Sequence, residues 1–300
     1  MKSSAEIVAK ARTMGVALPA FNIAHLPMVA PVIRAVRDQH SFALVEVSRI
    51  DCLKFGARSM AAVAEEFRRH ADAKHVRLHL DHVPVIDEDG NRVDWRASIA
   101  EALTLGYASV MLDGSRLALE DNIAASREAA AMAHAAGAAC EAELGAVLGH
   151  EAGPLPPYEE LFRSGRGFTR VDEARRFVGE TGIDWLSVAV GSVHGAIAVG
   201  ARDAKKVEAR LALDHLSALA EATGVPLVLH GGSGVRREDV LEGMRRGIAK
   251  INVGTEIRQA YEQALRSGGP EAAVQATYDR TVWVIRDSFG VQGIARRILA

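Results

Sequence analysis

The sequence has few cysteines and few aromatic residues, and it contains no long apolar run. Its two cysteines, Cys52 and Cys140, cannot form a disulfide framework or a thiolate zinc site. Aromatic residues make up only 5% of the chain, so alanine, valine, leucine and isoleucine must fill the core. No segment approaches the roughly 18 apolar residues of a membrane span, and the amino terminus has no apolar stretch of signal-peptide length. We therefore expect a cytoplasmic protein without a membrane partner.

Neither sign of charge is in excess. The 36 lysines and arginines face 38 acidic residues, which gives a formal net charge of −2. This balance argues against a nucleic-acid partner, because such binding draws most of its affinity from phosphate neutralisation. Basic pairs such as Arg68-Arg69 and Arg245-Arg246 are scattered along the chain and are typical of solvated helix faces.

Eight short apolar runs recur along the chain, each with the length of a strand. Longer segments with helical periodicity separate them, and Leu119–Ala136 and Asp214–Thr223 are the clearest of these. Strands that alternate with helices predict a parallel sheet, and eight such units predict an α/β fold, a (β/α)8 TIM barrel that forms a single domain over residues 1–300. A doubly wound open sheet is the alternative, but no dinucleotide-binding glycine motif follows the first run. The runs are Ala17–Phe21, Phe42–Val47, Val76–Leu80, Ser109–Leu112, Ala139–Leu144, Trp185–Val190, Leu227–Leu229 and Lys250–Val253.

Polar residues gather at the carboxyl ends of the predicted strands, where a barrel builds its active site. Two connections on that side exceed the usual loop length. The first, Pro84–Asp94, contains an Asp-Gly turn, and the second, Ala146–Arg170, carries several prolines and glycines. We expect residues 146–170 to include a mobile active-site loop, with a disordered insertion as the alternative.

Three of the 11 histidines lie at predicted strand ends, namely His82, His194 and His230. Imidazole is a preferred zinc ligand, and a catalytic zinc site keeps three protein ligands and one open position. Only a closed barrel would bring these residues together, and for each one a hydrogen-bonded core histidine is the alternative. Asp81, next to His82, could move protons beside a metal or could hold a ligand histidine in place. His79 alternates with Asp81 and is expected only to line the barrel.

Two glycine-containing segments follow the last two predicted strands. Gly231-Gly232-Ser233-Gly234 follows the seventh strand, and Asn252-Val253-Gly254-Thr255 follows the eighth. Barrels often bind phosphate through the backbone N–H groups of these two loops. The segments therefore predict a phosphate site, to which Gly195 could add a close backbone approach. Ordinary flexible turns are the alternative.

Seven sequence motifs span most of the chain: PAFN (19–22), LHLDH (78–82), SVMLDGS (109–115), EAELG (141–145), GSVHG (191–195), LHGGSG (229–234) and KINVGTE (250–256). In these motifs the sequence resembles the class II, metal-dependent fructose-bisphosphate aldolase family, which includes tagatose-bisphosphate aldolases. The resemblance implies reversible cleavage of a ketose bisphosphate, such as fructose 1,6-bisphosphate, to dihydroxyacetone phosphate and an aldehyde. It also implies one catalytic Zn²⁺, an additional monovalent cation in some cases, and a homodimer or homotetramer.

The resemblance assigns roles residue by residue. His82, His194 and His230 match the zinc-binding histidines, and Glu143 matches a glutamate that can approach the metal. Asp81 matches the aspartate that exchanges a proton with the hydroxyl at the cleaved bond. Glu151 matches the loop glutamate that moves the proton on the dihydroxyacetone carbon. The positions that match phosphate-binding or substrate-contacting residues are Gly195, Gly231, Gly232, Ser233, Asn252, Gly254, Thr255, Asn22 and Ser48.

The sequence departs from the family pattern mainly where the aldehyde half of the substrate would bind. Gly254 stands where many members carry Asp, Asn or Ala, and the loop Pro84–Asp94 is longer than usual. Three alternatives therefore stay open. They are an aldolase of the same family that acts on tagatose 1,6-bisphosphate or another ketose phosphate, a Schiff-base aldolase that uses Lys250, and a non-catalytic sugar-phosphate-binding barrel.

Overall fold

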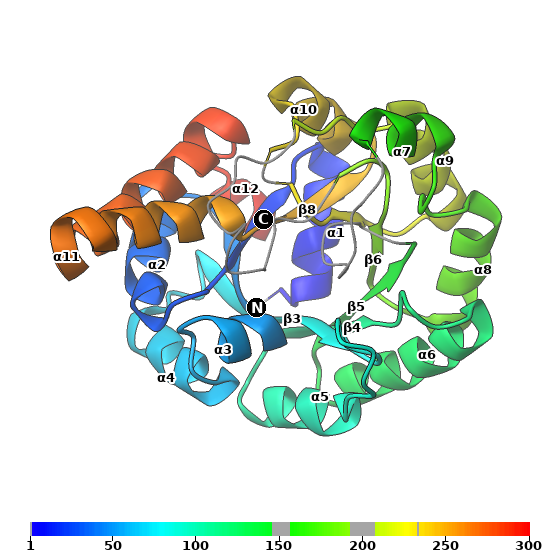
Figure 1. Ribbon diagram of the computed structural model, residues 1–300, viewed down its shortest axis with the longest axis horizontal. Coiled ribbons are helices and arrows are strands. Elements are labelled where there is room, and N and C mark those ends of the chain that lie inside the picture. Colours follow the sequence, from blue (N-terminus) through cyan, green and yellow to red (C-terminus); the bar gives the residue numbers. More distant parts are fainter. Residues whose placement is uncertain (1, 146–156, 193–207, 233) are drawn as a thin grey trace.

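The computed structural model describes residues 2–145, 157–192, 208–232 and 234–300. These residues form a closed barrel of eight parallel strands, in which each strand pairs with its neighbours in chain order and β1 pairs with β8 (Figure 1). Closure confirms the predicted (β/α)8 fold and rules out the open sheet. The strands are β1 (Leu18–Asn22), β2 (Ala43–Ser48), β3 (Val76–Pro84), β4 (Ser109–Asp113), β5 (Ala139–Leu144), β6 (Trp185–Val188), β7 (Leu227–Leu229) and β8 (Ile248–Val253).

Helices surround the strands, and one further helix covers the amino end of the barrel. The covering helix, α1 (Ser4–Met14), lies in the centre of Figure 1 and contacts β8. Ser3 and Glu6 form a capping box that fixes where α1 begins. The remaining helical segments are η1 (Leu26–Met28), α2 (Val29–Asp38), α3 (Arg49–Lys54), α4 (Met60–His70), α5 (Trp95–Thr104), α6 (Leu119–Ala135), α7 (Tyr158–Ser164), α8 (Val171–Thr181), α9 (Leu213–Thr223), α10 (Arg237–Arg245), α11 (Thr255–Trp283), η3 (Val284–Ser288) and α12 (Ala295–Leu299).

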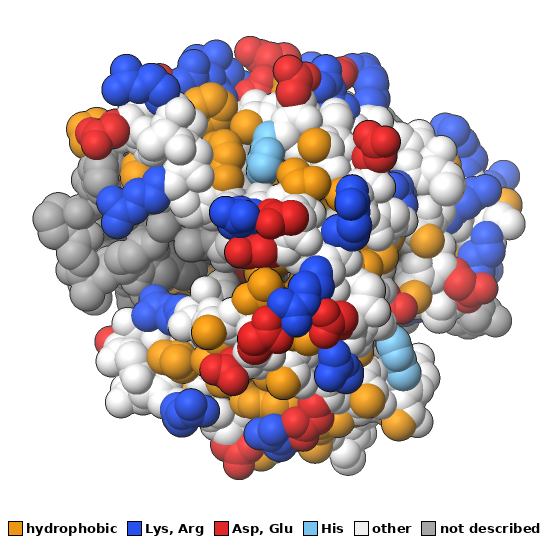
Figure 2. Space-filling model, turned by 90° about the vertical axis from the view of Figure 1, so that its right-hand side faces the viewer, with side chains coloured by type: hydrophobic (Ala, Val, Ile, Leu, Met, Phe, Trp, Pro, Cys, Tyr) orange, Lys and Arg blue, Asp and Glu red, His pale blue; other side chains and the backbone are white. Residues whose placement is uncertain are grey.

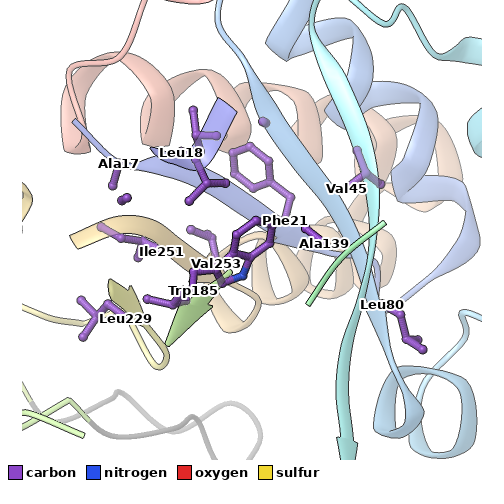
Figure 3. Packing of buried hydrophobic residues seen from close by; sticks show 14 of the residues in the cluster. Ala17, Leu18, Phe21, Val45, Leu80, Ala139, Trp185, Leu229, Ile251 and Val253 are labelled. Carbon is purple, nitrogen blue, oxygen red and sulfur yellow. The ribbon is translucent and has the colours of Figure 1, made fainter. Parts of the chain in front are cut away.

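Successive side chains of each strand point alternately to the helices and into the barrel. Apolar side chains on the outward positions form the main core, and Figure 3 shows Val45, Leu80, Leu229, Ile251 and Val253 among them. The inward positions near the carboxyl end are polar instead, although barrel interiors are usually filled by branched aliphatic residues. All of these inward side chains are buried: Glu46, His79, Asp81, Ser109, Glu141, Glu143, Ser187, Lys250 and Asn252.

Strand β3 extends beyond Leu80, where the hydrophobic pattern predicts its end. Its register with β4 shifts between Leu80 and Val83, so that Asp81 and His82 together lie opposite the single residue Met111. Two residues against one is the arrangement of a β-bulge, and His82 accordingly has a φ of +37°. The bulge explains how two adjacent side chains of one strand both reach the barrel interior. The predicted end of the strand at Leu80 is therefore wrong, because β3 continues to Pro84.

The first long connection, Pro84–Asp94, folds back on itself and is held by ion pairs. Arg49 Nη2 lies 3.2 Å from Asp87 Oδ2, and Lys54 Nζ lies 2.7 Å from Glu88 Oε1. Both basic residues belong to α3, so the connection is fixed against the helix that follows β2.

The second long connection is only partly a loop. Residues 146–156, for which a mobile segment is predicted, lie outside the described residues. Beyond them α7 forms, and the hydroxyl of Tyr158 accepts a hydrogen bond of 2.6 Å from the backbone N–H of Arg210. Tyr158–Ser164 is therefore a packed helix, and only Gly165–Arg170 continues as turn and irregular backbone.

Charges of both signs are interspersed over the face that Figure 2 shows, as the balanced composition leads us to expect. Ion pairs join charges of both signs on neighbouring helices, for example Arg176 of α8 with Glu120 of α6. No described helix combines the length and the apolar character that a bilayer crossing requires.

We expect Gly247→Ala to destabilise the barrel. Gly247 precedes β8 with a φ of +117°, and a Cβ atom there would lie 2.7 Å from the Cβ of Ala220 in α9. Strained backbone and overpacking together should lower the free energy of unfolding by about 1–3 kcal/mol, measured by urea denaturation. Gly179→Ala is the control, since it lies within α8 with no neighbour within 4 Å and should stabilise by about 0.5–1 kcal/mol. A stabilising effect of both substitutions would contradict this account.

Candidate functional site

The described site residues converge at the carboxyl end of the barrel, as the sequence predicts. Four predicted residues, Glu151, His194, Gly195 and Ser233, lie outside the described residues, so their assignments stay predictions. The others come from the ends of six strands or from the segments that directly follow them. They are Asn22, Ser48, Asp81, His82, Glu143, His230, Gly231, Gly232, Asn252, Gly254 and Thr255.

Two imidazole rings face each other at the centre of the site. Nε2 of His82 lies 2.7 Å from Nδ1 of His230. The other nitrogen of each ring meets a carboxylate: His82 Nδ1 is 3.4 Å from Asp113 Oδ2, and His230 Nε2 is 2.8 Å from Glu141 Oε1. Ligand atoms of Asp81 and of both histidines lie within 4.8 Å of one another. A histidine that is oriented by a carboxylate on its far side is the usual arrangement at metal centres, so this donor set fits a divalent metal ion.

Glu143 lies beside this pair. Its Oε2 is 3.6 Å from Nδ1 of His230 and accepts a hydrogen bond of 3.1 Å from the hydroxyl of Ser187. Burial, reinforced by the nearby Asp113, raises the pKa of Glu143 to about 8. A cation bound next to His230 would therefore stabilise the ionised form of Glu143.

Asp81 is buried and has two amide partners. The amide of Asn22 donates to Oδ2 over 2.8 Å, and the amide of Asn252 donates to Oδ1 over 2.9 Å. Burial opposes ionisation, but electrostatic attraction, first of all by His82, holds the pKa of Asp81 down at about 2. Each carboxylate oxygen keeps one further lone pair, so Asp81 can accept a proton from a hydroxyl group placed next to it.

Lys250, the candidate for a Schiff base, is fully buried and already committed to partners. Its Nζ lies 2.9 Å from Glu141 Oε2, 3.4 Å from Glu46 Oε2 and 2.7 Å from Asn252 Oδ1, to which it donates a hydrogen bond. Burial alone would lower the pKa of Lys250, but the two glutamates raise it above its ordinary value. An ammonium group has no lone pair with which to attack a carbonyl, so this geometry argues against the Schiff-base alternative.

A second group of possible ligands, Glu46, His79 and Asp81, has its ligand atoms within 4.8 Å of one another. His79 is held by a hydrogen bond of 2.8 Å between its Nδ1 and the hydroxyl of Ser109, and burial lowers the pKa of His79 to about 3. A metal in this group would lie next to the buried ammonium of Lys250, 3.4 Å from Glu46. The repulsion between two buried cations makes this group part of the interior polar network and not a second metal site.

The two glycine-containing segments lie at the ends of adjacent strands, where a phosphate site is predicted. A Cβ at Gly232 would lie 2.4 Å from Cγ2 of Ile251, so its backbone runs tightly against β8. Gly254 caps α11, which begins at Thr255. The unpaired N–H groups at a helix start favour an anion, and the arrangement is compatible with phosphate binding.

Asn22 and Ser48 differ in how far their polar atoms are already engaged. Ser48 lies opposite Asp81 in the β2–β3 register, but its hydroxyl caps α3 by exchanging hydrogen bonds with Asp51. Asn22 donates to Asp81, and its Oδ1 would lie 3.3 Å from a Cβ at Gly254. Asn22 therefore sets the position of a catalytic candidate, whereas Ser48 also has a structural role.

Sequence reasoning did not assign a role to Asp113, Glu141 or Glu46. Glu141 and Glu143 stand two residues apart in β5, as do Lys250 and Asn252 in β8. This two-residue spacing could have identified Glu141 as an inward-facing residue, because strand alternation places both members of each pair on the same face.

A parallel barrel with histidines and carboxylates converging at its carboxyl end defines a class of barrel enzymes that use a divalent metal. Residues 2–298 match the family model described as fructose-bisphosphate aldolase class-II, and the chain belongs to this family.

Individual relatives agree with the family match. The chain is 32% identical over 283 residues to a fructose-bisphosphate aldolase of Streptococcus pneumoniae, covering 93% of this chain and 87% of the relative. It is 33% identical to the 6-phospho-5-dehydro-2-deoxy-D-gluconate aldolase of Halalkalibacterium halodurans, covering 88% of this chain and 84% of the relative. The crystal structure of the YdjI aldolase from Escherichia coli K12 superposes with a TM-score of 0.76 at 26% identity, covering 98% of this chain and 100% of that one. The protein is thus a class II aldolase, a carbon–carbon lyase.

We expect Glu46→Gln to stabilise the protein in a pH-dependent manner. Burial, and next the charge of Asp81, raise the pKa of Glu46 well above its ordinary value of 4.5 in the folded state. The unfolded chain therefore loses this proton first, and Glu46 reduces stability as the pH rises above about 4.5. The variant should exceed the wild type by about 1 kcal/mol in the free energy of unfolding at pH 7.5, and the difference should shrink towards pH 4.5. Thermal melts across this range test the expectation.

The control is Glu65→Gln, which removes a carboxylate that is 62% exposed. The difference in free energy of unfolding between Glu65→Gln and the wild type should not grow with pH. A constant difference between Glu46→Gln and the wild type at every pH would contradict the buried-charge explanation.

Proposed function

We propose that the protein uses a divalent metal to cleave a ketose phosphate reversibly into dihydroxyacetone phosphate and an aldehyde, with fructose 1,6-bisphosphate as the first substrate to test. The observation that carries the proposal is the approach of His82 Nε2 to His230 Nδ1 at 2.7 Å, directly beside Asp81. This arrangement places a proton acceptor next to a metal-binding pair, which is what carbonyl cleavage chemistry requires.

We assign the metal to His82, His194 and His230, and Glu143, 3.6 Å from His230, is a further candidate ligand. When bound, such an ion acts as a Lewis acid that stabilises the negative charge left by carbon–carbon cleavage. Zn²⁺ suits a set of donors rich in imidazole. The far-side partners Asp113 and Glu141 support the assignment, because they orient the rings of His82 and His230.

The remaining roles follow from position. Asp81 accepts the proton of the hydroxyl at the cleaved bond while Asn22 and Asn252 hold its two oxygens. Glu151 returns a proton to the dihydroxyacetone carbon. The substrate phosphate binds to backbone N–H groups of the segments around Gly195, Gly231–Ser233 and Asn252–Thr255, and Asn22 and Ser48 line the substrate.

Two relatives favour different partners for the distal end of the substrate. One is named a fructose-bisphosphate aldolase, whereas the name of the other specifies an acid with a single phosphate. Gly254, which presents no side chain beside Asn22, is compatible with either end group. A ketose phosphate without the distal phosphate is therefore the second candidate, followed by tagatose 1,6-bisphosphate. A homodimer or homotetramer, an additional monovalent cation and a cytoplasmic location remain predictions from the family resemblance.

We expect cleavage to depend on metal and to need no lysine adduct. Dialysis against EDTA should abolish formation of dihydroxyacetone phosphate, and Zn²⁺ should restore it, because the proposed site has no other Lewis acid. A coupled assay with glycerol-3-phosphate dehydrogenase measures the product from fructose 1,6-bisphosphate, tagatose 1,6-bisphosphate, fructose 1-phosphate and 6-phospho-5-dehydro-2-deoxy-D-gluconate. Cleavage that survives EDTA, together with trapping of substrate by borohydride, would instead support Lys250.

Asp81→Asn should lower kcat by about 10²–10⁴-fold, the usual contribution of a general base. KM should change little, because the amide keeps the size of the side chain. Asp89→Asn, which changes an exposed residue of the Pro84–Asp94 connection, is the control for loss of one carboxylate. A kcat of Asp81→Asn within threefold of the wild type would contradict the assigned role.

A further inference from the structure

We propose that Lys250 is a positioning residue that orients both the proton acceptor Asp81 and the metal-binding ring of His230. The inference rests on the proposed function for the roles of these two groups. Lys250 itself touches neither of them, since its Nζ contacts Glu141, Glu46 and Asn252. Lys250 acts on each of these two groups through one intermediate side chain.

The first connection runs from Lys250 through Asn252 to Asp81. An ammonium group has three donors and no acceptor, so the atom of Asn252 that lies 2.7 Å from Nζ must be the amide oxygen. This contact turns the NH₂ group of Asn252 towards Asp81 Oδ1, to which it donates over 2.9 Å. Without the ammonium group, the amide of Asn252 could reverse and present an oxygen to the carboxylate. Lys250 therefore fixes the orientation of the Asn252 amide so that its NH₂ group, and not its oxygen, faces Asp81.

The second connection runs from Lys250 through Glu141 to His230. Oε2 of Glu141 receives hydrogen bonds from Lys250 and from the indole N–H of Trp185, and both of these groups are donors only. Oε1 is then directed to Nε2 of His230, 2.8 Å away. A proton on Nε2 leaves the lone pair of His230 on Nδ1, the nitrogen that faces His82. The same lysine thus helps to select the tautomer that can bind a metal.

The two connections share one buried cation and join two strands that are not neighbours in the barrel. Lys250 and Asn252 belong to β8, Glu141 belongs to β5, and Lys250 and Glu141 are both fully buried. The proton acceptor and the metal-binding ring are consequently oriented together, and a change at Lys250 should affect both. A side chain that only fills space would affect neither in a specific way.

Lys250→Met keeps the approximate size of the side chain and removes all three donors. Its first readout is the dissociation constant for Co²⁺, measured with the metal-free protein by visible spectroscopy and chelator competition, and it needs no substrate. We expect binding to weaken by about 10–100-fold, as for loss of other groups that orient metal ligands. Co²⁺ affinity equal to that of the wild type, in a variant with unchanged circular dichroism, would overturn the connection to His230.

The second readout is kcat for whichever of the four sugar phosphates the wild type cleaves fastest, assayed at saturating metal. Lys250→Met should lower kcat at least tenfold with little change in KM. In an Asp81→Asn background the same substitution should lower kcat by less than threefold, because residues that act through one group are not additive. Equal fold-losses in both backgrounds would overturn the connection to Asp81.

Glu141→Gln tests the proposal if Lys250→Met does not fold. Lys250 and Trp185 would hold the amide oxygen, so the NH₂ group would face His230 Nε2 and shift the ring proton to Nδ1. Co²⁺ affinity should then fall by about 10–100-fold, and retention of wild-type affinity would overturn the proposal.

Two control variants and one comparison complete the experiment. Lys74→Met removes an exposed lysine, and Glu65→Gln removes an exposed carboxylate. Both should keep Co²⁺ affinity and kcat within threefold of the wild type, and a larger loss in either would overturn a specific role for Lys250. If the wild type cleaves none of the sugar phosphates, the proposed function fails, whereas Co²⁺ affinity still decides the role of Lys250 towards His230.

Discussion

The buried ion pair between Lys250 and Glu141 is the interaction on which the polar interior of this barrel depends. Burying one charge without a partner costs several kcal/mol, and here the two charges lie 2.9 Å apart with no exposure to solvent. Each also makes further hydrogen bonds, Lys250 to Asn252 and Glu141 to Trp185 and His230. The pair therefore lets a charged layer replace the aliphatic layer that would otherwise fill this end of the barrel.

This layer explains how strands position the side chains of the described part of the site. Asp81, His82 and His230 are held by residues of four other strands, namely Asn22 of β1, Asp113 of β4, Glu141 of β5 and Asn252 of β8. Side chains held on strands are more precisely placed than side chains on loops. Among the described residues, the segments that follow the strands contribute the glycine-containing backbone near Gly232 and Gly254.

The fold was largely predictable because each strand presents an apolar outward face at regular spacing. Ala139–Leu144 and Leu227–Leu229 are found as predicted, whereas β3 continues past its expected end. Hydrophobicity could not reveal this continuation, since the polar residues Asp81 and His82 interrupt the pattern and a register shift depends on the neighbouring strand. The helix α7 was missed for a related reason, because the prolines just before it indicate a loop.

The candidate site was only partly predictable from the sequence. Motifs at strand ends identify Asp81, His82 and His230, and strand alternation identifies the inward residues of β5 and β8. Alternation does not reveal which inward residues meet across the barrel, so the pairing of Lys250 with Glu141 needed the closed structure. The sequence identifies which residue types could carry the chemistry, but it does not identify the residues that each one contacts.

The bulge in β3 has a consequence for how the site responds to motion. Because Asp81 and His82 are consecutive residues, their Cα atoms are held about 3.8 Å apart by covalent bonds. His230 reaches the same place from β7, so its distance from His82 depends on the packing of strands. A change in strand packing alters the distance between His82 and His230, whereas the Cα atoms of Asp81 and His82 keep their covalent spacing.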